Sequence, residues 1–289
     1  MASLRFGHQK NTSQLMAPAS SRDFLASQLM APASSKDSHR GVKVFLEFFA
    51  VFITFAVSKQ LMMKTVAIIV AGGSGTRFGA QLPKQFLQLG GMPVLMRTIR
   101  TFGENGDSSF DVIVTLPQGQ MELWSQLCAK YCFDVPHRVV AGGETRWHSV
   151  KNALDSVGDT ADVDVIAVHD GVRPLATANL IHRVLEAARR DGAAIPVVPL
   201  NDSVRQIVGN DSHALDRSSL RAVQTPQAFD ARLLQEAYGQ PFDPTFTDDA
   251  SVVERYGHSV TLVEGDPQNL KITRPMDLAL AEYLLNPDA

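Results

Sequence analysis

Short apolar runs rich in β-branched residues alternate with longer amphipathic stretches from residue 64 onward. The apolar runs predict strands, at 66–70, 111–116, 137–141, 164–170, 193–200 and 259–265. The stretches between them predict helices, at 93–102, 118–131, 145–157, 177–192, 231–239 and 248–257. Such alternation is typical of βαβ units with right-handed crossovers. We therefore expect an α/β fold whose mostly parallel, twisted sheet is covered by helices.

Two of the predicted strands, at 66–70 and 165–168, are apolar at consecutive positions. Strands of this kind are buried on both faces, as in the centre of a helix-covered parallel sheet. Ligands of open α/β sheets bind beyond the carboxyl ends of the strands. We therefore expect the residues from Ala71 onward and from His169 onward to line one crevice.

The stretch 199–227 interrupts this rhythm. Its polar and apolar residues alternate around the sequence Gly209-Asn210-Asp211, which predicts a β-hairpin arm. An arm that protrudes from a compact domain exposes the edges of its strands, and proteins commonly cover such edges with another chain. The pattern therefore predicts a homodimer formed through the arm.

The first part of the chain differs from the rest. The segment SQLMAPASS occurs twice in a stretch rich in Ser, Ala and Pro. The apolar run at 42–57 contains Lys43 and Glu47 and is shorter than the roughly 20 residues that a spanning helix needs. We expect 1–62 to be a leader that is disordered or not part of the native protein, followed by a catalytic domain at 63–289. A membrane or targeting segment and an extra structured element are the alternatives for this leader.

The net charge bears on which macromolecules the chain can bind, and the cysteines bear on metal binding and redox compartment. The chain has 27 Lys and Arg against 30 Asp and Glu, a formal net charge of −3. It therefore lacks the basic surface that nucleic-acid binding requires, and we expect neither a nucleic-acid partner nor a membrane partner for 63–289. Cys128 and Cys132 lie four residues apart on one predicted helix face, with no neighbouring His or Cys to complete a zinc site. They indicate reduced thiols in a cytoplasmic protein.

A glycine-rich segment, VAGGSGTRFGAQLPKQF at 70–86, follows the first predicted strand. It is not a Walker A loop, because Ala80 rather than Lys follows Gly79. It is not a dinucleotide fingerprint either, because Phe78 occupies the position of the third glycine. Glycine backbone can wrap a nucleotide and direct N–H groups at phosphate oxygens, while Arg77 and Lys84 supply cations. The segment predicts a triphosphate-binding loop.

Asp170 ends a buried predicted strand in the motif VHDGVRP, at the edge of the expected crevice. A carboxylate there suits Mg²⁺, which takes one or two protein carboxylates together with phosphate oxygens and waters. The alternative is a capping role for the turn that follows. We expect His169 to be a packed, hydrogen-bonded residue rather than a base, and Arg173 either to brace the loop or to contact substrate.

The motifs taken together resemble a known family. GSGTR followed by PK, AGGETRWHSV, VHDGVRP, DRSSLR with QTPQAF, TDDAS and NLKITRPMDLALAE are similar to those of the 2-C-methyl-D-erythritol 4-phosphate cytidylyltransferases of non-mevalonate isoprenoid synthesis. The resemblance extends from Met63 to the C-terminus in the same motif order. Ser203 replaces an expected threonine and keeps the hydroxyl, and Gly171-Val172 replaces a pair of small residues. The resemblance implies a Rossmann-like nucleotidyltransferase fold.

The resemblance also implies residue roles. The residues implied to bind CTP are Ala71, Gly72, Gly73, Gly75, Thr76, Gly143, Glu144 and Ser149. The residues implied to act in catalysis are Arg77 and Lys84, which would stabilise charge at the α-phosphate, together with Lys271 and Arg217, which would position the attacking phosphate, Arg217 from the neighbouring subunit. The residues implied to bind the acceptor are Arg173, Asp202, Ser203 and Thr247, and Asp170 is implied to hold Mg²⁺.

The implied reaction transfers CMP from CTP to 2-C-methyl-D-erythritol 4-phosphate, a small polyol phosphate, and releases pyrophosphate. A ribitol 5-phosphate cytidylyltransferase is the first alternative, because it has the same loop and the same HD motif. A non-catalytic nucleotide sensor tethered by the leader is the second. A sensor could lose the residues that chemistry needs, but Lys84, Asp170 and Lys271 are all present.

Overall fold

The structure is a computed structural model that describes residues 64–72, 82–103 and 110–286. The chain divides into two units, Met1–Leu61 and Met62–Ala289, and every described residue belongs to the second. The predicted leader lies outside the described residues. Among the helices that are described, none combines the length and the apolar character needed to cross a membrane.

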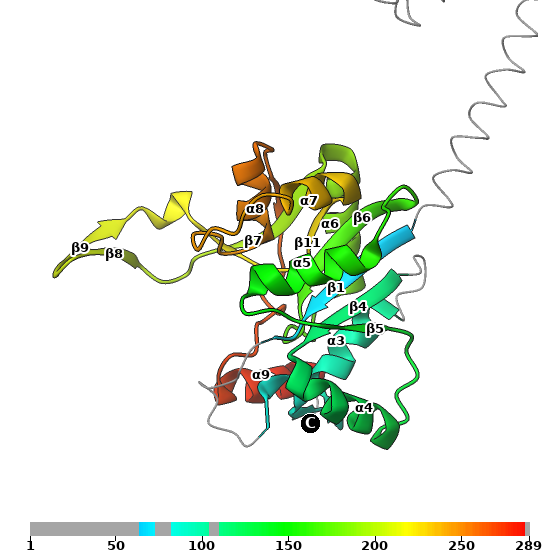
Figure 1. Cartoon of the computed structure of the whole chain (residues 1–289). Coiled ribbons are helices and arrows are strands. Elements are labelled where there is room, and N and C mark those ends of the chain that lie inside the picture. Colours follow the sequence, from blue (N-terminus) through cyan, green and yellow to red (C-terminus); the bar gives the residue numbers. More distant parts are fainter. Residues whose placement is uncertain (1–63, 73–81, 104–109, 287–289) are drawn as a thin grey trace, which may run out of the picture. The chain divides into compact units, whose positions relative to one another are not determined.

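An eight-stranded sheet forms the centre of the second unit (Figure 1). Its strands follow the order β10-β7-β11-β6-β1-β4-β5, and β12 pairs with β7. Their bounds are β1 Lys64–Val70, β4 Phe110–Leu116, β5 Arg138–Ala141, β6 Val163–Asp170, β7 Ala193–Pro199, β10 Arg221–Val223, β11 Gln227–Asp230 and β12 Thr261–Glu264. The six predicted strands are confirmed. The short strands β10 and β11 were not expected, and both run antiparallel to their neighbours.

Seven α-helices are described in this unit: α3 Val94–Gly103, α4 Met121–Lys130, α5 Arg146–Val157, α6 Ala178–Asp191, α7 Ala231–Ala237, α8 Asp249–Tyr256 and α9 Pro275–Leu285. Helices α3 to α8 cover the two faces of the sheet, whereas α9 packs in a separate apolar cluster with residues of the segment before α3 and of the turn after β6. Alternate residues of β1 show the arrangement, since Ala67 and Ile69 pack with α3, α4 and α6, whereas Val66 and Ile68 pack with α5, α7 and α8. The predicted α/β fold, with its mostly parallel sheet between helices, is confirmed.

Side-chain caps set where several helices begin. Thr145 accepts a hydrogen bond from the His148 amide at the start of α5, and Asp248 accepts one from the Ser251 amide at the start of α8. Such caps satisfy amide groups that have no partner within the helix. They therefore fix the first turn of each helix.

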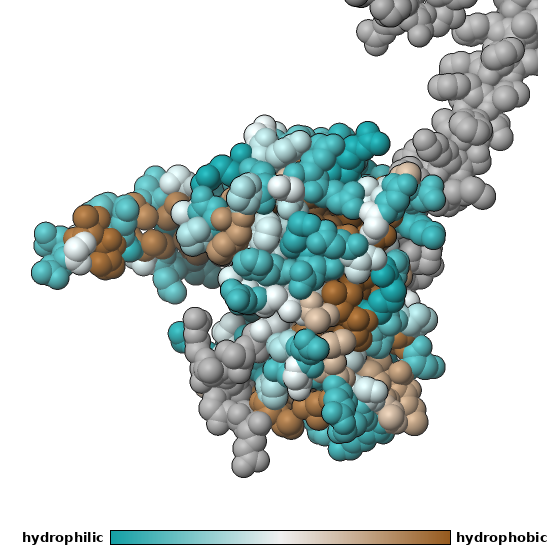
Figure 2. Space-filling model, viewed as in Figure 1, coloured by the Kyte–Doolittle hydropathy of each residue, from teal (hydrophilic) through white to brown (hydrophobic). Residues whose placement is uncertain are grey.

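The predicted arm is present but shorter than 199–227 (Figure 1). Strands β8, Val204–Val208, and β9, Asp211–Leu215, pair antiparallel and join no other described strand. The residues after them return to the central sheet, because β10 pairs with β7 and Gln227 begins β11. Apolar side chains gather near the tip, where Ile207 is 70% exposed (Figure 2).

The two cysteines do not share a helix face. Helix α4 ends at Lys130, and Cys132 follows it with a φ of 48°. Cys128 therefore lies on the helix and Cys132 beyond its end. Both thiols are free.

Packing of α3 against the sheet should contribute strongly to the stability of the domain. Leu95 of α3 is 0% exposed, so Leu95→Ala should lower the free energy of unfolding by about 2–5 kcal/mol, through lost burial and the cavity left behind. Leu262→Ala is the matched control, because this side chain is 58% exposed, and should change the free energy by less than about 0.5 kcal/mol. Urea denaturation followed by circular dichroism measures both. Equal losses would contradict the assigned packing.

Candidate active site

A cleft of about 240 Å³ opens at the carboxyl ends of β1 and β6. Four segments that are far apart in the sequence form it: the residues after β1, the turn before α5, the end of β6 and the residues before α9. Its described lining consists of Val70, Ala71, Gly72, Lys84, Gln85, Gly143, Glu144, Thr145, Arg146, Ser149, Asp170, Val172 and Lys271. The crevice expected from the strand pattern is therefore present.

The cleft brings together all the described residues that were expected to serve the nucleotide or its metal. These are Ala71, Gly72, Lys84, Gly143, Glu144, Ser149 and Asp170, and Lys271, which was expected to position the attacking phosphate, lines the same cleft. Gly73, Gly75, Thr76 and Arg77 lie outside the described residues. Arg173, Asp202, Ser203, Arg217 and Thr247 are described, but they do not line the cleft.

Asp170 is the only aspartate among the described lining residues, and cations surround it. Its Oδ2 is 3.1 Å from the Arg173 Nε and 3.1 Å from the Lys271 Nζ, and its Oδ1 is 3.9 Å from the Arg146 Nε. Burial alone would raise the pKa of this carboxyl. The charges of the three cations outweigh burial and hold the pKa well below its ordinary value, so the group is ionised at neutral pH.

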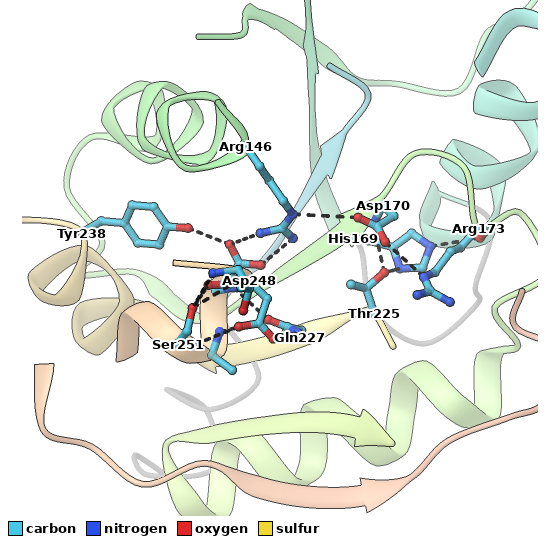
Figure 3. A network of polar contacts seen from close by, with 12 residues as sticks. Arg146, His169, Asp170, Arg173, Thr225, Gln227, Tyr238, Asp248 and Ser251 are labelled. Atoms are coloured by element: carbon cyan, nitrogen blue, oxygen red, sulfur yellow. Dashed lines mark hydrogen bonds and ion pairs between the residues drawn. The ribbon is translucent and has the colours of Figure 1, made fainter. Parts of the chain in front are cut away.

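His169 and Arg173 belong to the hydrogen-bond network around Asp170 (Figure 3). The His169 ring lies between the Arg173 carbonyl oxygen, 3.0 Å from Nε2, and the Thr225 hydroxyl, 3.1 Å from Nδ1. Burial lowers the pKa of His169 to about 4, so the ring is neutral, and the prediction of a packed histidine is confirmed. Arg173 is buried and also donates to the Asn269 carbonyl at 2.8 Å. Of its two predicted roles, these contacts are those of a loop brace.

The turn before α5 is shaped by close contacts. A Cβ on Gly143 would lie 2.3 Å from the Cβ of His148, so only glycine fits there. The Gly143 amide donates to the Ser149 hydroxyl at 3.1 Å, and that hydroxyl donates to the Thr145 carbonyl at 3.0 Å. Ser149 thus holds the turn while its side chain lines the cleft.

Gln85 is a lining residue that the sequence did not indicate. Its buried amide donates to the Ala71 carbonyl at 3.0 Å and to the Gln120 side chain at 2.8 Å. The contact joins the end of β1 to the segment that carries Lys84. No sequence signal predicts it, because a glutamine shows no preference for a partner fourteen residues earlier.

Arg146 and Asp249 form a second unexpected feature. The Arg146 Nη1 and Nη2 donate to the two carboxylate oxygens of Asp249 at 2.7 and 2.6 Å, and the Tyr238 hydroxyl donates to Oδ1 at 2.7 Å. Both residues stand in motifs that the sequence singled out, TRWHSV and TDDAS. Their pairing across 103 positions had no sequence signal.

The residues expected to bind the acceptor lie outside this cleft. Asp202 and Ser203 are exposed and precede β8 at the base of the arm. Arg217 is exposed at the start of the short helix Arg217–Ser219 and donates to the Asn201 carbonyl. Thr247 precedes α8, and its amide donates to the Ser251 hydroxyl at 3.1 Å.

The chain matches known proteins over most of its length. The family described as 2-C-methyl-D-erythritol 4-phosphate cytidylyltransferase matches residues 65–287. Proteins of that name from Bacteroides thetaiotaomicron and Bacteroides fragilis are 48% and 49% identical over 223 and 224 residues, which cover 77% of this chain and 100% of each relative. The crystal structure of the protein of that name from Thermus thermophilus has a TM-score of 0.61 and 36% identity, covering 77% of this chain and 98% of that one.

The Arg146–Asp249 pair should matter for stability because Asp249 is fully buried. Asp249→Asn leaves the guanidinium without its ionic partner and should lower the free energy of unfolding by about 3–5 kcal/mol. Asp111→Asn is the control, because its pair with Arg138, at 2.8 Å, is exposed and should contribute less than about 1 kcal/mol. Chemical denaturation of the two variants measures the difference. Similar losses of unfolding free energy in the two variants would show that the buried pair contributes no more to stability than the exposed pair.

Proposed function

The chain belongs to the 2-C-methyl-D-erythritol 4-phosphate cytidylyltransferase family, and from that membership we propose how its cleft works. The enzyme transfers CMP from CTP to 2-C-methyl-D-erythritol 4-phosphate. The products are 4-diphosphocytidyl-2-C-methyl-D-erythritol and pyrophosphate, in isoprenoid precursor biosynthesis. The observation that carries this function is the convergence of Lys84, Asp170 and Lys271 on one cleft in a chain that matches the family from 65 to 287.

Both alternatives are less well supported. Transfer to ribitol 5-phosphate has no support in the matched family or in the two Bacteroides relatives, all of which carry the methylerythritol name. A sensor could lose the residues that only the transfer needs, but Lys271, which would position the acceptor, lines the cleft together with Lys84 and Asp170.

The nucleotide half of the proposed mechanism uses the turn before α5 and the residues after β1. Backbone groups at Ala71, Gly72 and Gly143 would bind the cytidine without losing side-chain entropy. Lys84, from the described cleft, and Arg77, outside the described residues, would stabilise the negative charge that builds around the α-phosphorus. Charge stabilisation and positioning are most of what a transfer at phosphorus requires.

The acceptor half uses Lys271. Its ammonium lines the cleft 3.1 Å from the Asp170 carboxylate, and its side chain is partly exposed. From there it would position the acceptor's phosphate, whose oxygen attacks the α-phosphorus in line while pyrophosphate leaves from the opposite side. The attacking phosphate is already ionised at neutral pH, so no general base is needed, which agrees with a neutral His169.

Asp170 fits a Mg²⁺ site. Its Oδ2 is engaged by Arg173 and Lys271, whereas its Oδ1 faces the Arg146 Nε at 3.9 Å, beyond hydrogen-bond length. One ionised carboxylate oxygen facing a phosphate-binding cleft is a donor set that Mg²⁺ uses together with phosphate oxygens and waters. When bound there, the ion would neutralise charge on the triphosphate.

A homodimer in the cytoplasm completes the proposal. The exposed apolar tip of the arm supports a second copy as its partner, and Arg217 at the arm's base would then serve the neighbouring site. Asp202, Ser203 and Thr247 would bind the hydroxyls and the phosphate of the acceptor. The two free cysteines agree with a reducing compartment.

Pyrophosphate release by the full chain tests the reaction. The expected result is release with CTP, Mg²⁺ and 2-C-methyl-D-erythritol 4-phosphate, none with ribitol 5-phosphate, and none when EDTA removes the metal. Release with ribitol 5-phosphate alone would move the enzyme to the first alternative. Silence with both acceptors, from a folded chain that binds CTP, would favour the sensor.

Lys84→Ala tests the assigned charge stabilisation. Removing one preorganised cation from the developing charge should lower kcat about 100- to 1,000-fold while the fold persists. Lys130→Ala is the matched control, because that lysine is exposed at the end of α4, away from the cleft. Steady-state pyrophosphate release measures both variants. A kcat near that of the parent in Lys84→Ala would remove this lysine from the mechanism.

A further inference from the structure

Arg146 is a cleft residue to which the proposed mechanism gives no role. It is the first residue of α5 and directly follows the nucleotide turn at Gly143–Thr145. Its side chain is 27% exposed, whereas the Asp249 carboxylate that holds it is 0% exposed. Burial alone would lower the pKa of this guanidinium, but Asp249, by its charge and its hydrogen bonds, raises it above the ordinary value. The guanidinium is therefore charged; Asp249 holds its two Nη atoms, and its Nε faces Asp170.

The partner of Arg146 is itself locked by several groups. The Tyr238 hydroxyl donates to Asp249 Oδ1, and the Gln227 Oε1 accepts from the Asp249 amide at 3.1 Å and from the Ala250 amide at 3.0 Å. Gln227 also donates to the Asp248 carboxylate at 2.9 Å (Figure 3). These hydrogen bonds anchor the start of α8, and Asp249 presents both carboxylate oxygens to Arg146.

These contacts close a circuit around Asp170. Gln227 lies two residues after Thr225, whose hydroxyl accepts from the Asp170 amide at 3.0 Å. From Asp170 the circuit runs through Thr225, along the backbone to Gln227 and on to Asp249. It returns through Arg146, which Asp249 holds and whose Nε lies 3.9 Å from Asp170 Oδ1. Figure 3 labels Asp170, Thr225, Gln227 and Arg146. Its members come from β6, β11, α8 and α5, with Thr225 just before β11.

From this circuit we propose that Arg146, held by Asp249, is a positioning residue for the nucleotide. The pair ties the start of α5 to the start of α8 and thereby holds the turn at Gly143–Thr145 at a set place beside Asp170. This inference rests on the proposed function, because it assumes that CTP binds against that turn. Removing one partner of a buried ion pair is costly, but replacing both by apolar residues of the same shape is often neutral or stabilising, so positioning gives a reason for the pair that net stability does not.

The test compares CTP affinity in Asp249→Asn and Arg146→Lys with that of the parent chain, by calorimetric titration in Mg²⁺ without acceptor. Both variants remove the two-oxygen contact, since an ammonium cannot match a guanidinium fork. The dissociation constant for CTP should rise about 10- to 100-fold in each, as when a supporting partner of a site is lost. The KM for the acceptor should stay unchanged. Asp111→Asn, on the exposed pair with Arg138, should bind CTP as the parent does.

Three results would overturn the inference. CTP affinity equal to the parent's in a folded Asp249→Asn would leave the pair a purely structural contact. Weaker binding in Arg146→Lys with parental binding in Asp249→Asn would mean that Arg146 contacts the nucleotide directly instead. Equal rises in the KM values for CTP and for the acceptor would indicate a general loosening of the cleft.

A milder variant covers the case in which Asp249→Asn does not fold. Tyr238→Phe removes one hydrogen bond from Asp249 and keeps both charges, so CTP affinity should fall by a smaller factor in the same direction. No change in a folded Tyr238→Phe, together with no change in Arg146→Lys, would overturn the inference. The titration measures CTP binding and needs no turnover. If the parent chain bound CTP but transferred nothing to methylerythritol phosphate, the proposed function would be wrong, and the titration could still test the inference.

Discussion

A buried carboxylate at the end of the central strand β6 is the constraint on which the cleft depends. Asp170 is largely removed from water, and a buried charge without partners would cost several kcal/mol. Arg173, Lys271 and Arg146 supply those partners from three different segments. Each of these segments therefore has to arrive at the carboxyl end of the sheet, and the cleft is the space that they enclose.

The same balance of charge prepares the cleft for a triphosphate. Cations held in place by a carboxylate and by backbone carbonyls need little reorganisation when a more highly charged ligand enters. Arg173 is fixed on the Asn269 carbonyl and Arg146 on Asp249, whereas Lys271 is more exposed and can turn toward a second substrate. The two arginines are thus held by several protein groups, whereas Lys271 is the most exposed of the three cations around Asp170.

Rigid and peripheral parts of the molecule are clearly separated. The turn at Gly143, the support of His169 and the circuit through Gln227 all rest on the packed sheet and its helices. The arm, in contrast, pairs only with itself among the described strands and exposes Ile207. Its residues have no role within a single described chain that would explain such exposure, which is why a second copy is the natural partner in the proposed mechanism.

The sequence by itself determined six of the eight strands of the central sheet, the helices between them and the edge at which the cleft forms. It could do so because strand and helix periods, glycines and caps act over a few residues, and because parallel strands place their carboxyl ends together. Only the tertiary structure decided the insertion of β11 beside β6, the link from Gln85 to Ala71 and the pairing of Arg146 with Asp249. These features join segments far apart in the chain, and a side chain's own identity carries no information about which distant partner will be packed against it.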